Sequence, residues 1–324
     1  MPAVAGEGPF ERLCPMVTGR TRRPPTVVAV VGPTAAGKTE LSLDLAEALG
    51  GEVVNTDAMQ VYRGMDVGTA KVPPDERRGV AHHLLDLLDV HEPATVAQFQ
   101  ALARGVVDDC RARGVVPVLV GGSALYTRAV LDRFEFPGTD PGVRAALEAE
   151  LAEHGSGALH RRLAEQDPSA ARQIIASNGR RVVRALEVIA ITGRPFSASL
   201  PERRYFYEPT VQVGVRIPRP VLDERIEQRV RRMWDTGLVD EVRRLEQAGL
   251  REGRTANRAI GYQQVLAFLA GDCSEEEAFE QTVAATRRFA RRQESWFVKD
   301  DRIVWVDWDD RDRVRRAVAA VTAG

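Results

Sequence analysis

The sequence predicts an α/β protein, with a parallel sheet flanked by helices and an all-helical subdomain inserted into it. Three observations support this fold class. An apolar strand runs into a glycine-rich loop and then a helix, strand-like and helix-like segments alternate up to about residue 135, and residues 136–209 contain helical stretches without strands between them. Alternating strands and helices with short connections are typical of a doubly wound core.

The strands are predicted from β-branched runs that lack polar alternation. Such runs are expected where a parallel sheet is covered on both faces. Each is followed by glycine, polar or turn-forming residues, which mark its end. The predicted strands are residues 26–31, 52–57, 82–90, 115–123, 210–217 and 302–308.

The helices are predicted from capping residues and glycine stops. The helix after the glycine-rich loop ends at Gly50-Gly51, and another begins after Thr95 and ends at Gly114. Four helical stretches fill residues 136–209, and a long helix covers residues 274–297. We therefore expect a catalytic core of residues 26–135 and 210–324, a helical insertion of residues 136–209, and a disordered tail over residues 1–25.

The composition is that of a globular protein, with 44% hydrophobic and 28% charged residues. No run approaches the ~18 apolar residues that a membrane span needs, and residues 1–25 do not read as a signal peptide. The three cysteines, Cys14, Cys110 and Cys273, lie far apart and suit a reducing cytoplasm. A formal net charge of −1 argues against a uniformly basic coat. No protein partner is implied, so a monomer is the default expectation.

Residues Gly32 to Thr39 match the pattern G-x-x-x-x-G-K-[ST]. Backbone N–H groups of such a loop cradle phosphate oxygens, while the Lys contacts phosphate and the Ser/Thr hydroxyl binds Mg²⁺. The loop follows a strand and opens a helix, which is the context that supports a P-loop. The sequence therefore predicts a P-loop NTPase-like core, with Lys38 on a phosphate and Thr39 on Mg²⁺.

Asp57 lies at the carboxyl end of the second predicted strand, at the edge where open α/β sheets place ligand groups. There it could orient or deprotonate an acceptor, although an Asp that caps a turn is the commoner case. In the long connection after it, Thr69 and Lys71 could face a diphosphate. The predicted strand that ends in Gly121-Gly122-Ser123 lacks the acidic residue that a nucleotide hydrolase uses, which argues against hydrolysis of a nucleotide.

Arginine clusters suggest a polyanionic partner. Arg225, Arg229 and Arg232 are spaced to share one helix face, and Arg287, Arg288, Arg291 and Arg292 pair at i, i+4. Each cluster alone is more often a solvated, ion-paired helix face. Tyr262, Gln263 and Gln264 could stack on and hydrogen-bond an unpaired base. Together they favour an RNA ligand.

These segments together resemble the tRNA dimethylallyltransferases of bacterial type. "GPTAAGKT", "DAMQVYRGMDVGTAK", "HHLLD", "VGGSALY", "RRVVRALEV", "RIEQRV", "AIGYQQ" and "ATRRFARRQ" occur in that order. The family transfers a dimethylallyl group from its diphosphate to N6 of adenosine 37, next to the tRNA anticodon. The resemblance implies that the loop holds a diphosphate leaving group and that the adenine is flipped out of its stack.

The resemblance also implies roles for individual residues. Asp57 would be the base for the adenine amine, assisted by Thr34, with Lys38 and Arg229 at the reacting centre. The diphosphate would be bound by Gly32, Pro33, Thr34, Ala35, Ala36, Gly37, Lys38 and Thr39 with Mg²⁺, and by Arg225 or Arg229 as an outer clamp. The tRNA contacts would be Asp57, Ala58, Met59, Gln60, Ser123, Arg144, Arg180, Arg181, Arg184, Ala259, Ile260, Gly261, Tyr262, Gln263 and Gln264.

Three other functions remain open from the sequence. An adenylate isopentenyltransferase would share the core but alkylate free AMP, ADP or ATP, and is expected to lack much of the insertion of about seventy residues. An ATP-dependent small-molecule kinase would consume ATP. A non-catalytic RNA-binding protein would have no need of Asp57 beside an intact phosphate loop.

Overall fold

The centre of the molecule is a six-stranded sheet with the strand order β3-β2-β4-β1-β5-β6. Every neighbouring pair of strands is parallel. The computed structural model describes residues 24–134, 136–199 and 203–323, so the expected tail of residues 1–25 lies almost wholly outside the described residues. The strands are β1 (Val27–Val31), β2 (Gly51–Asn55), β3 (His82–His83), β4 (Val116–Val120), β5 (Thr210–Arg216) and β6 (Ile303–Asp307).

The prediction of a long third strand was wrong, because β3 contains only His82 and His83. Leu84 and Asp86 have φ angles of 64° and 56°, a left-handed conformation that cannot continue a strand. The N–H groups of Leu87 and Leu88 donate to the carbonyl of Val61 instead of joining the sheet. The apolar residues of this segment are therefore part of a loop that packs on the core.

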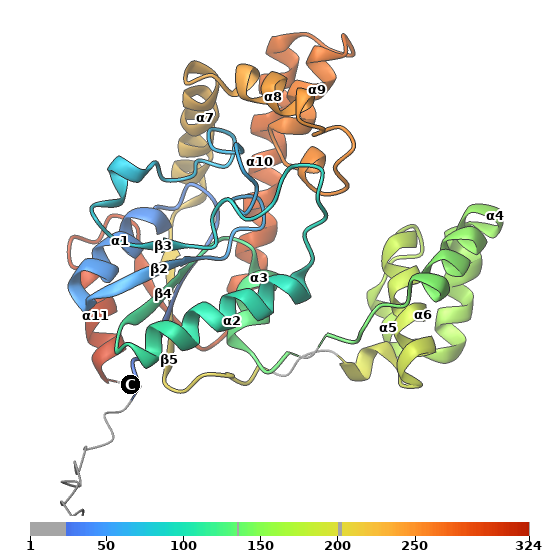
Figure 1. The fold of residues 1–324 in the computed structure, drawn as a ribbon, viewed down its shortest axis with the longest axis horizontal. Helices are drawn as coiled ribbons and strands as arrows, with labels where there is room; N and C mark the ends of the chain where they lie inside the picture. The colour runs from blue at the N-terminus through green and yellow to red at the C-terminus, as the bar shows by residue number, and fades with distance from the viewer. Residues whose placement is uncertain (1–23, 135, 200–202, 324) are drawn as a thin grey trace, which may run out of the picture.

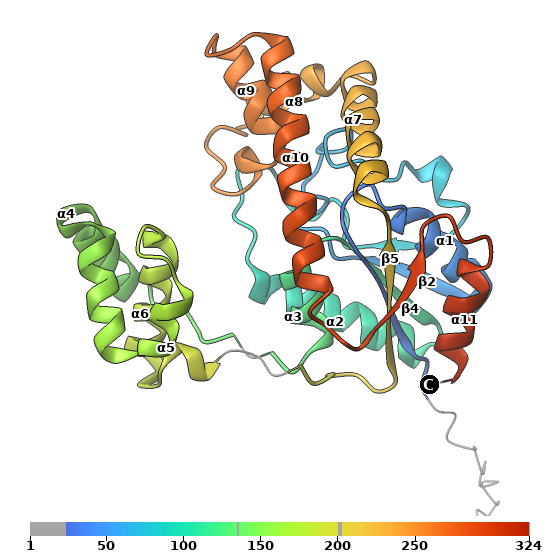
Figure 2. The same cartoon turned by 180° about the vertical axis from the view of Figure 1, so that it is seen from behind.

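Helices cover both faces of the sheet, as the fold class predicts (Figures 1 and 2). One hydrophobic core joins Val28 and Val30 of β1 to helices α1 (Lys38–Leu49) and α11 (Arg313–Ala323). The other core joins Val27, Ala29 and Val31 to α2 (Val96–Ala112) and α3 (Ala124–Leu131). The predicted caps are confirmed: Thr95 accepts from the Gln98 N–H, and Gly50 ends α1 with a φ of 61°.

Four further helices extend past one end of the sheet, at the top of Figures 1 and 2. A capping box between Ser274 and Glu277 starts the longest of them, as a Ser followed three residues later by Glu indicates. These helices are α7 (Arg219–Asp235), α8 (Leu238–Gln247), α9 (Tyr262–Leu269) and α10 (Glu275–Phe297). Short 3₁₀ turns occur at Pro74–Arg77, Phe196–Ser199 and Ala256–Arg258.

The remaining helices form a separate lobe beside the core (Figures 1 and 2). They are α4 (Pro141–Gln166), α5 (Pro168–Gln173) and α6 (Gly179–Thr192), and they enclose a hydrophobic core of their own. Val182 and Val183 lie in that core, with 0% and 3% exposure. The two connecting segments pair at Asp132 and Tyr205, so the lobe leaves and rejoins the core at one place.

Membrane-spanning helices were not expected, and within the described ranges no helix is long and apolar enough to cross a bilayer.

Candidate active site

The glycine-rich loop lies between β1 and α1, at the place in the fold that the motif predicts. Gly37 has a φ of 99° and Ala35 a φ of 63°, which turns the chain sharply before the helix begins. Lys38 folds back over the loop, and its Nζ donates to the Pro33 carbonyl at 2.8 Å. Free N–H groups at a helix N-terminus favour an anion at this position.

Three cavities meet around this loop. The loop cavity, of about 80 Å³, is lined by Thr34, Lys38, Thr39, Asp57 and Arg229 among others. A basic basin of about 530 Å³ opens from Lys38, Thr39 and Arg229 toward solvent. An apolar cavity of about 280 Å³ opens on the other side, from Thr34, Asp57 and Arg229. Arg229 lines all three cavities, while Thr34 and Asp57 lie where the loop cavity meets the apolar one.

One face of α7 forms a wall of the basic basin. The guanidinium groups of Arg225, Arg229 and Arg232 all line it, which confirms the shared face that their spacing predicts. Arg225 Nη2 would lie 3.9 Å from a Cβ on Gly37, and Arg225 stacks on Trp308 with 5.2 Å between its Cζ and the ring centroid. Arg225 therefore faces the outside of the phosphate loop, while Arg229 reaches its inside.

The electrostatics of the loop cavity favour binding of an anion. Burial, and then the positive charge of Arg229, lower the pKa of Lys38 to about 7, while Asp57 opposes the shift. Burial also lowers the pKa of Arg229. In the loop cavity two cations lie near the single carboxylate of Asp57, and a diphosphate would neutralise the remaining positive charge.

Asp57 fits both of the roles that the sequence left open. Its Oδ1 accepts from the Met59 N–H at 2.9 Å, so it does cap a turn. The side chain of Asn55 fixes its backbone, accepting from the Asp57 N–H at 2.8 Å and donating to its carbonyl at 3.1 Å. Among the described residues none forms an ion pair with the Asp57 carboxylate, and Asp57 lines two cavities. A fixed, unpaired carboxylate at this place can accept a proton.

The strand end without an acidic residue has a structural reason. A Cβ on Gly121 would lie 2.3 Å from Thr56 Oγ1, and a Cβ on Gly122 would lie 2.2 Å from Gln293 Nε2. No side chain, and so no Mg²⁺-binding Asp, fits at either position. Gln293 donates to the Gly122 carbonyl and accepts from the Thr34 N–H, at 2.9 and 2.8 Å.

Gln293 is a site residue that the sequence analysis missed, although its motif was noted. The signal was a helical periodicity: Thr282, Thr286, Phe289 and Gln293 follow one face of α10 at i, i+4, i+7 and i+11. The first three line the apolar cavity, and Phe289 and Gln293 line the loop cavity. The arginines on other faces of this helix obscured the pattern.

The apolar cavity collects many of the residues predicted to contact tRNA. Ala58, Met59, Ser123, Ala259 and Ile260 line it. Val230, Met233 and Phe289 complete its apolar wall, and Arg258 lies at its edge. Gln60 lies in the adjoining loop cavity. This cavity can accept a flat or branched apolar group close to Asp57.

The structure does not support the predicted stacking of a base on Tyr262, although Tyr262 is among the residues that line the apolar cavity. Tyr262 is 0% exposed, and its hydroxyl donates to Glu241 at 2.6 Å inside the protein. Gln264 is also buried, because its side-chain oxygen caps α9 by accepting from the Gly261 N–H at 2.8 Å. Of these three neighbouring residues only Gln263 is exposed. The sequence showed three residues able to bind a base, but helix capping and burial use two of them.

Lys71 does not face a diphosphate, so that expectation was also wrong. Its side chain is 4% exposed and forms ion pairs with Asp66 and Asp86, each at 2.6 Å. Its Nζ also donates to the Tyr62 carbonyl at 2.9 Å. A buried ammonium group needs such partners, and they leave it no role in the cavity. The Thr69 hydroxyl donates to the Met65 carbonyl, although Thr69 itself lines both cavities.

The arginines of the helical lobe fall into two groups. Arg144 and Arg184 both pair with Glu187, which is fully buried, and Arg184 also donates to the Pro137 and Gly138 carbonyls. Arg180 and Arg181 are exposed on α6, and neither forms an ion pair with another residue that the structure describes. Arg144 and Arg184 therefore stabilise the lobe, whereas Arg180 and Arg181 present free charge.

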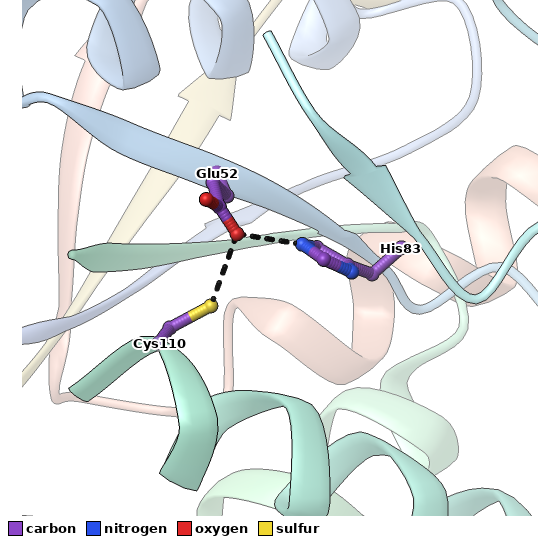
Figure 3. Close-up of side chains that lie close together, drawn as sticks. All are labelled: Glu52, His83 and Cys110. Carbon is purple, nitrogen blue, oxygen red and sulfur yellow. Dashed lines mark hydrogen bonds and ion pairs between the residues drawn. The ribbon is translucent and has the colours of Figure 1, made fainter. Parts of the chain in front are cut away.

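A second cluster of titratable groups lies near the other end of β2 (Figure 3). In the described part of the chain, Glu52, His83 and Cys110 are the one group of three whose ligand atoms could hold a metal ion. The Arg113 guanidinium lies on the same carboxylate at 2.8 and 2.7 Å, and burial raises the pKa of Cys110 to about 11. The cluster is therefore a satisfied hydrogen-bond network.

Comparison with known proteins identifies the family. The model of the IPP transferase family matches residues 60–300. The chain belongs to the IPP transferase family. A "tRNA dimethylallyltransferase" of Thermobifida fusca is 63% identical over 91% of this chain and 94% of its own length. A protein of the same name from Streptomyces griseus is 63% identical over 89% of this chain and 92% of its own length.

Solved structures agree with this membership. The tRNA isopentenylpyrophosphate transferase of Bacillus halodurans has a TM-score of 0.66 and 40% identity, and the match covers 92% of this chain and 95% of that one. A eukaryotic dimethylallyltransferase described as acting on tRNA has a TM-score of 0.79 and 25% identity, over 91% of this chain and 78% of that one. The P-loop-like fold is thus shared with solved members of the family.

Proposed function

We propose that this enzyme transfers the dimethylallyl group of dimethylallyl diphosphate to N6 of adenosine 37 in tRNA, releasing diphosphate. One observation carries the proposal: the loop cavity, which contains the cations Lys38 and Arg229, meets the apolar cavity at Thr34, Asp57 and Arg229. A diphosphate fits the first cavity, and the allyl group and an adenine fit the second. The named relatives support a tRNA acceptor over free AMP.

Departure of the diphosphate would be assisted by the cationic side. The N–H groups of Gly37, Lys38 and Thr39 at the start of α1 would face the oxygens on which negative charge grows. The side chains of Lys38 and Arg229 would contact the same oxygens, and Arg225 and Arg232 would bind from the basin. Mg²⁺ needs only one or two protein oxygens, because phosphate and water supply its other ligands. Thr39 lines both the loop cavity and the basic basin, so its hydroxyl could be such an oxygen. When bound, that ion would share the charge of the leaving group.

Acceptance of the proton would fall to Asp57. As the N6–C bond forms, the adenine amine must lose a proton, and the Asp57 carboxylate faces the cavity from a turn fixed by Asn55. Thr34 lies at the same junction. The base must leave its stack to reach this depth, and Met59, Ile260 and Phe289 offer it apolar contacts.

The anticodon stem-loop is the proposed macromolecular partner. Arg180 and Arg181 on the lobe, and Arg288, Arg291 and Arg292 on α10, are exposed. Each contact with a phosphate adds affinity that salt weakens. The isolated cysteines and the absence of an implied protein partner support a cytoplasmic monomer as part of this proposal.

A transfer assay tests the function. Radiolabelled dimethylallyl diphosphate is offered with an unmodified anticodon stem-loop and with AMP as rival acceptors. We expect label in the RNA, none in AMP, and loss of labelling when adenosine 37 is replaced by guanosine. Label in AMP would support the adenylate isopentenyltransferase instead, and ATP consumption without any prenyl transfer would support a kinase.

A further inference from the structure

The segment from Asp66 to Lys71 contributes to the walls of two cavities: Gly68 lines the apolar cavity and Ala70 the loop cavity. Its Thr69 carbonyl accepts from Arg229 Nη2 at 3.3 Å and from Gln60 Nε2 at 3.2 Å. Thr69 lines both cavities. The position of this one carbonyl therefore fixes two side chains of the site. The question is what fixes the segment, because a connection without regular structure does not hold its own shape.

A buried carboxylate from a distant helix holds it. Glu241 on α8 is 2% exposed, and one of its oxygens accepts from the N–H groups of Asp66 and Val67 at 3.0 and 2.8 Å. The other oxygen accepts from the Gly68 N–H at 3.1 Å and from the Tyr262 hydroxyl at 2.6 Å. Four hydrogen bonds satisfy the buried charge, and three of them fix consecutive residues of the segment.

Close packing keeps the segment against the same helices. A Cβ on Gly68 would lie 2.4 to 2.7 Å from atoms of the Tyr262 ring, so only glycine allows this approach. Burial, followed by the charge of Glu241, raises the pKa of Tyr262 well above its usual 10, so the phenol remains a donor at ordinary pH. At the far end of the segment, Lys71 pairs with Asp66 and Asp86.

We propose that Glu241 is a positioning residue for the transfer reaction, acting through the backbone of residues 66–68 to orient Arg229 and Gln60. The inference rests on the proposed function, since Arg229 faces the diphosphate there. Glu241 is not itself among the residues that line the three cavities. A neutral Gln in its place would keep the volume but offer one acceptor oxygen and one NH₂ group, which repels the converging N–H groups.

The first test is steady-state kinetics of Glu241→Gln with the anticodon stem-loop. We expect kcat/KM for dimethylallyl diphosphate to fall by about ten- to a hundredfold, because a displaced Arg229 binds the leaving group poorly. The matched control is Glu246→Gln, the same change on the same helix, where the carboxylate pairs with Arg251 near the surface. It should leave kcat and KM within about twofold of the wild type. An active wild type with unchanged kinetics in Glu241→Gln would overturn the inference.

The second test separates positioning from general structural support. Glu241→Gln is combined with Arg229→Gln and compared with Arg229→Gln alone. If Glu241 acts through Arg229, Glu241→Gln should lower kcat/KM much less in the Arg229→Gln background than in the wild type. The reason is that Glu241 then no longer has an arginine to orient. An equal loss in both backgrounds would show a role that does not pass through Arg229, and would contradict the proposal.

Tyr262→Phe guards against a variant that does not fold. It removes one hydrogen-bond donor to Glu241 and keeps the buried ring. We expect kcat/KM for dimethylallyl diphosphate to fall, but by less than in Glu241→Gln. If Glu241→Gln is insoluble and Tyr262→Phe folds with wild-type kinetics, the proposal fails. A wild-type enzyme that forms no prenylated RNA contradicts the proposed function, and this inference with it.

Discussion

Strand β2 has a carboxylate near each of its ends, and the two differ in their surroundings. At the amino end, Glu52 contacts His83 at 2.7 Å and Cys110 at 3.5 Å (Figure 3). Both terminal nitrogens of Arg113 also donate to its carboxylate. Just past the carboxyl end, Asp57 accepts one backbone N–H and faces two cavities. The same kind of group is thus structural where its partners satisfy it and available for chemistry where they do not.

The backbone explains why the two ends differ. The carboxyl ends of β1, β2 and β4 lie side by side, since Val120 pairs with both Val30 and Asn55. The chain turns outward there, and its loops leave room for a ligand. At the amino end, α2 closes over the strand, because Cys110 and Arg113 belong to its last turn and its cap.

Asp57→Asn should have the largest effect. It keeps the shape of the side chain and the bond from Met59 but removes the proton acceptor. We expect kcat for prenyl transfer to fall by about 100- to 10,000-fold while binding of tRNA and the melting temperature change little. Rapid-quench single turnovers at several RNA concentrations measure the rate and the binding of tRNA, and a thermal melt measures the melting temperature. Full activity in this variant would exclude Asp57 as the base.

Arg229→Gln should have the second largest effect, because it removes the one cation that lines all three cavities. We expect a loss of about 100- to 1,000-fold in kcat/KM for dimethylallyl diphosphate. Arg225→Gln is the matched control, because Arg225 lies on the same helix but outside the loop. Its kcat/KM should fall by less than that of Arg229→Gln. A larger loss for Arg225→Gln would reverse the assignment of the inner and outer arginines.

Glu52→Gln should affect stability and not the chemistry. The Arg113 guanidinium is the main cause that lowers the pKa of Glu52 from its usual 4.5 to about 2. The folded state therefore gains stability from this carboxylate above about pH 4.5 and loses it as the pH falls toward 2.

The measurement is urea unfolding of the wild type and Glu52→Gln at several pH values. At pH 7 we expect the variant to be less stable by about 1.5–3 kcal/mol, with the difference shrinking at pH 3. Prenyl transfer at 25 °C should stay within about twofold of the wild type, as for a change remote from the site. A loss of transfer as large as that of Asp57→Asn would break the comparison between the two ends.

The smallest expected effect is in thiol labelling, where folded Cys110 should not react. Burial raises the pKa of the Cys110 thiol to about 11, so at pH 8 the reactive thiolate is nearly absent. Iodoacetamide should leave Cys110 unmodified in the folded enzyme and label it in urea, as read by peptide mass spectrometry. Cys273 is more exposed and serves as the internal control. Rapid labelling of folded Cys110 would indicate that α2 opens over the cluster.

Local patterns predicted most of the elements. Five of the six strands and the phosphate loop follow from β-branched runs and from glycines with positive φ, both of which act over a few residues. The third strand failed because positive φ at Leu84 and Asp86 is not visible in an apolar run. Tyr262 and Lys71 failed because their partners, Glu241 and Asp86, are brought to them by the fold.

The sequence by itself determined the chemistry that is available here: a phosphate-binding loop, a carboxylate after a strand, arginines on helix faces, and membership of a family. These depend on residue types at short spacing, which any fold of this chain preserves. Only the tertiary structure decided which groups are free. It gave Glu187 two arginines, gave Glu241 the backbone of residues 66–68, and left Asp57 and Arg229 facing the cavities. A buried charge requires partners, and partners distant in sequence are chosen by packing alone.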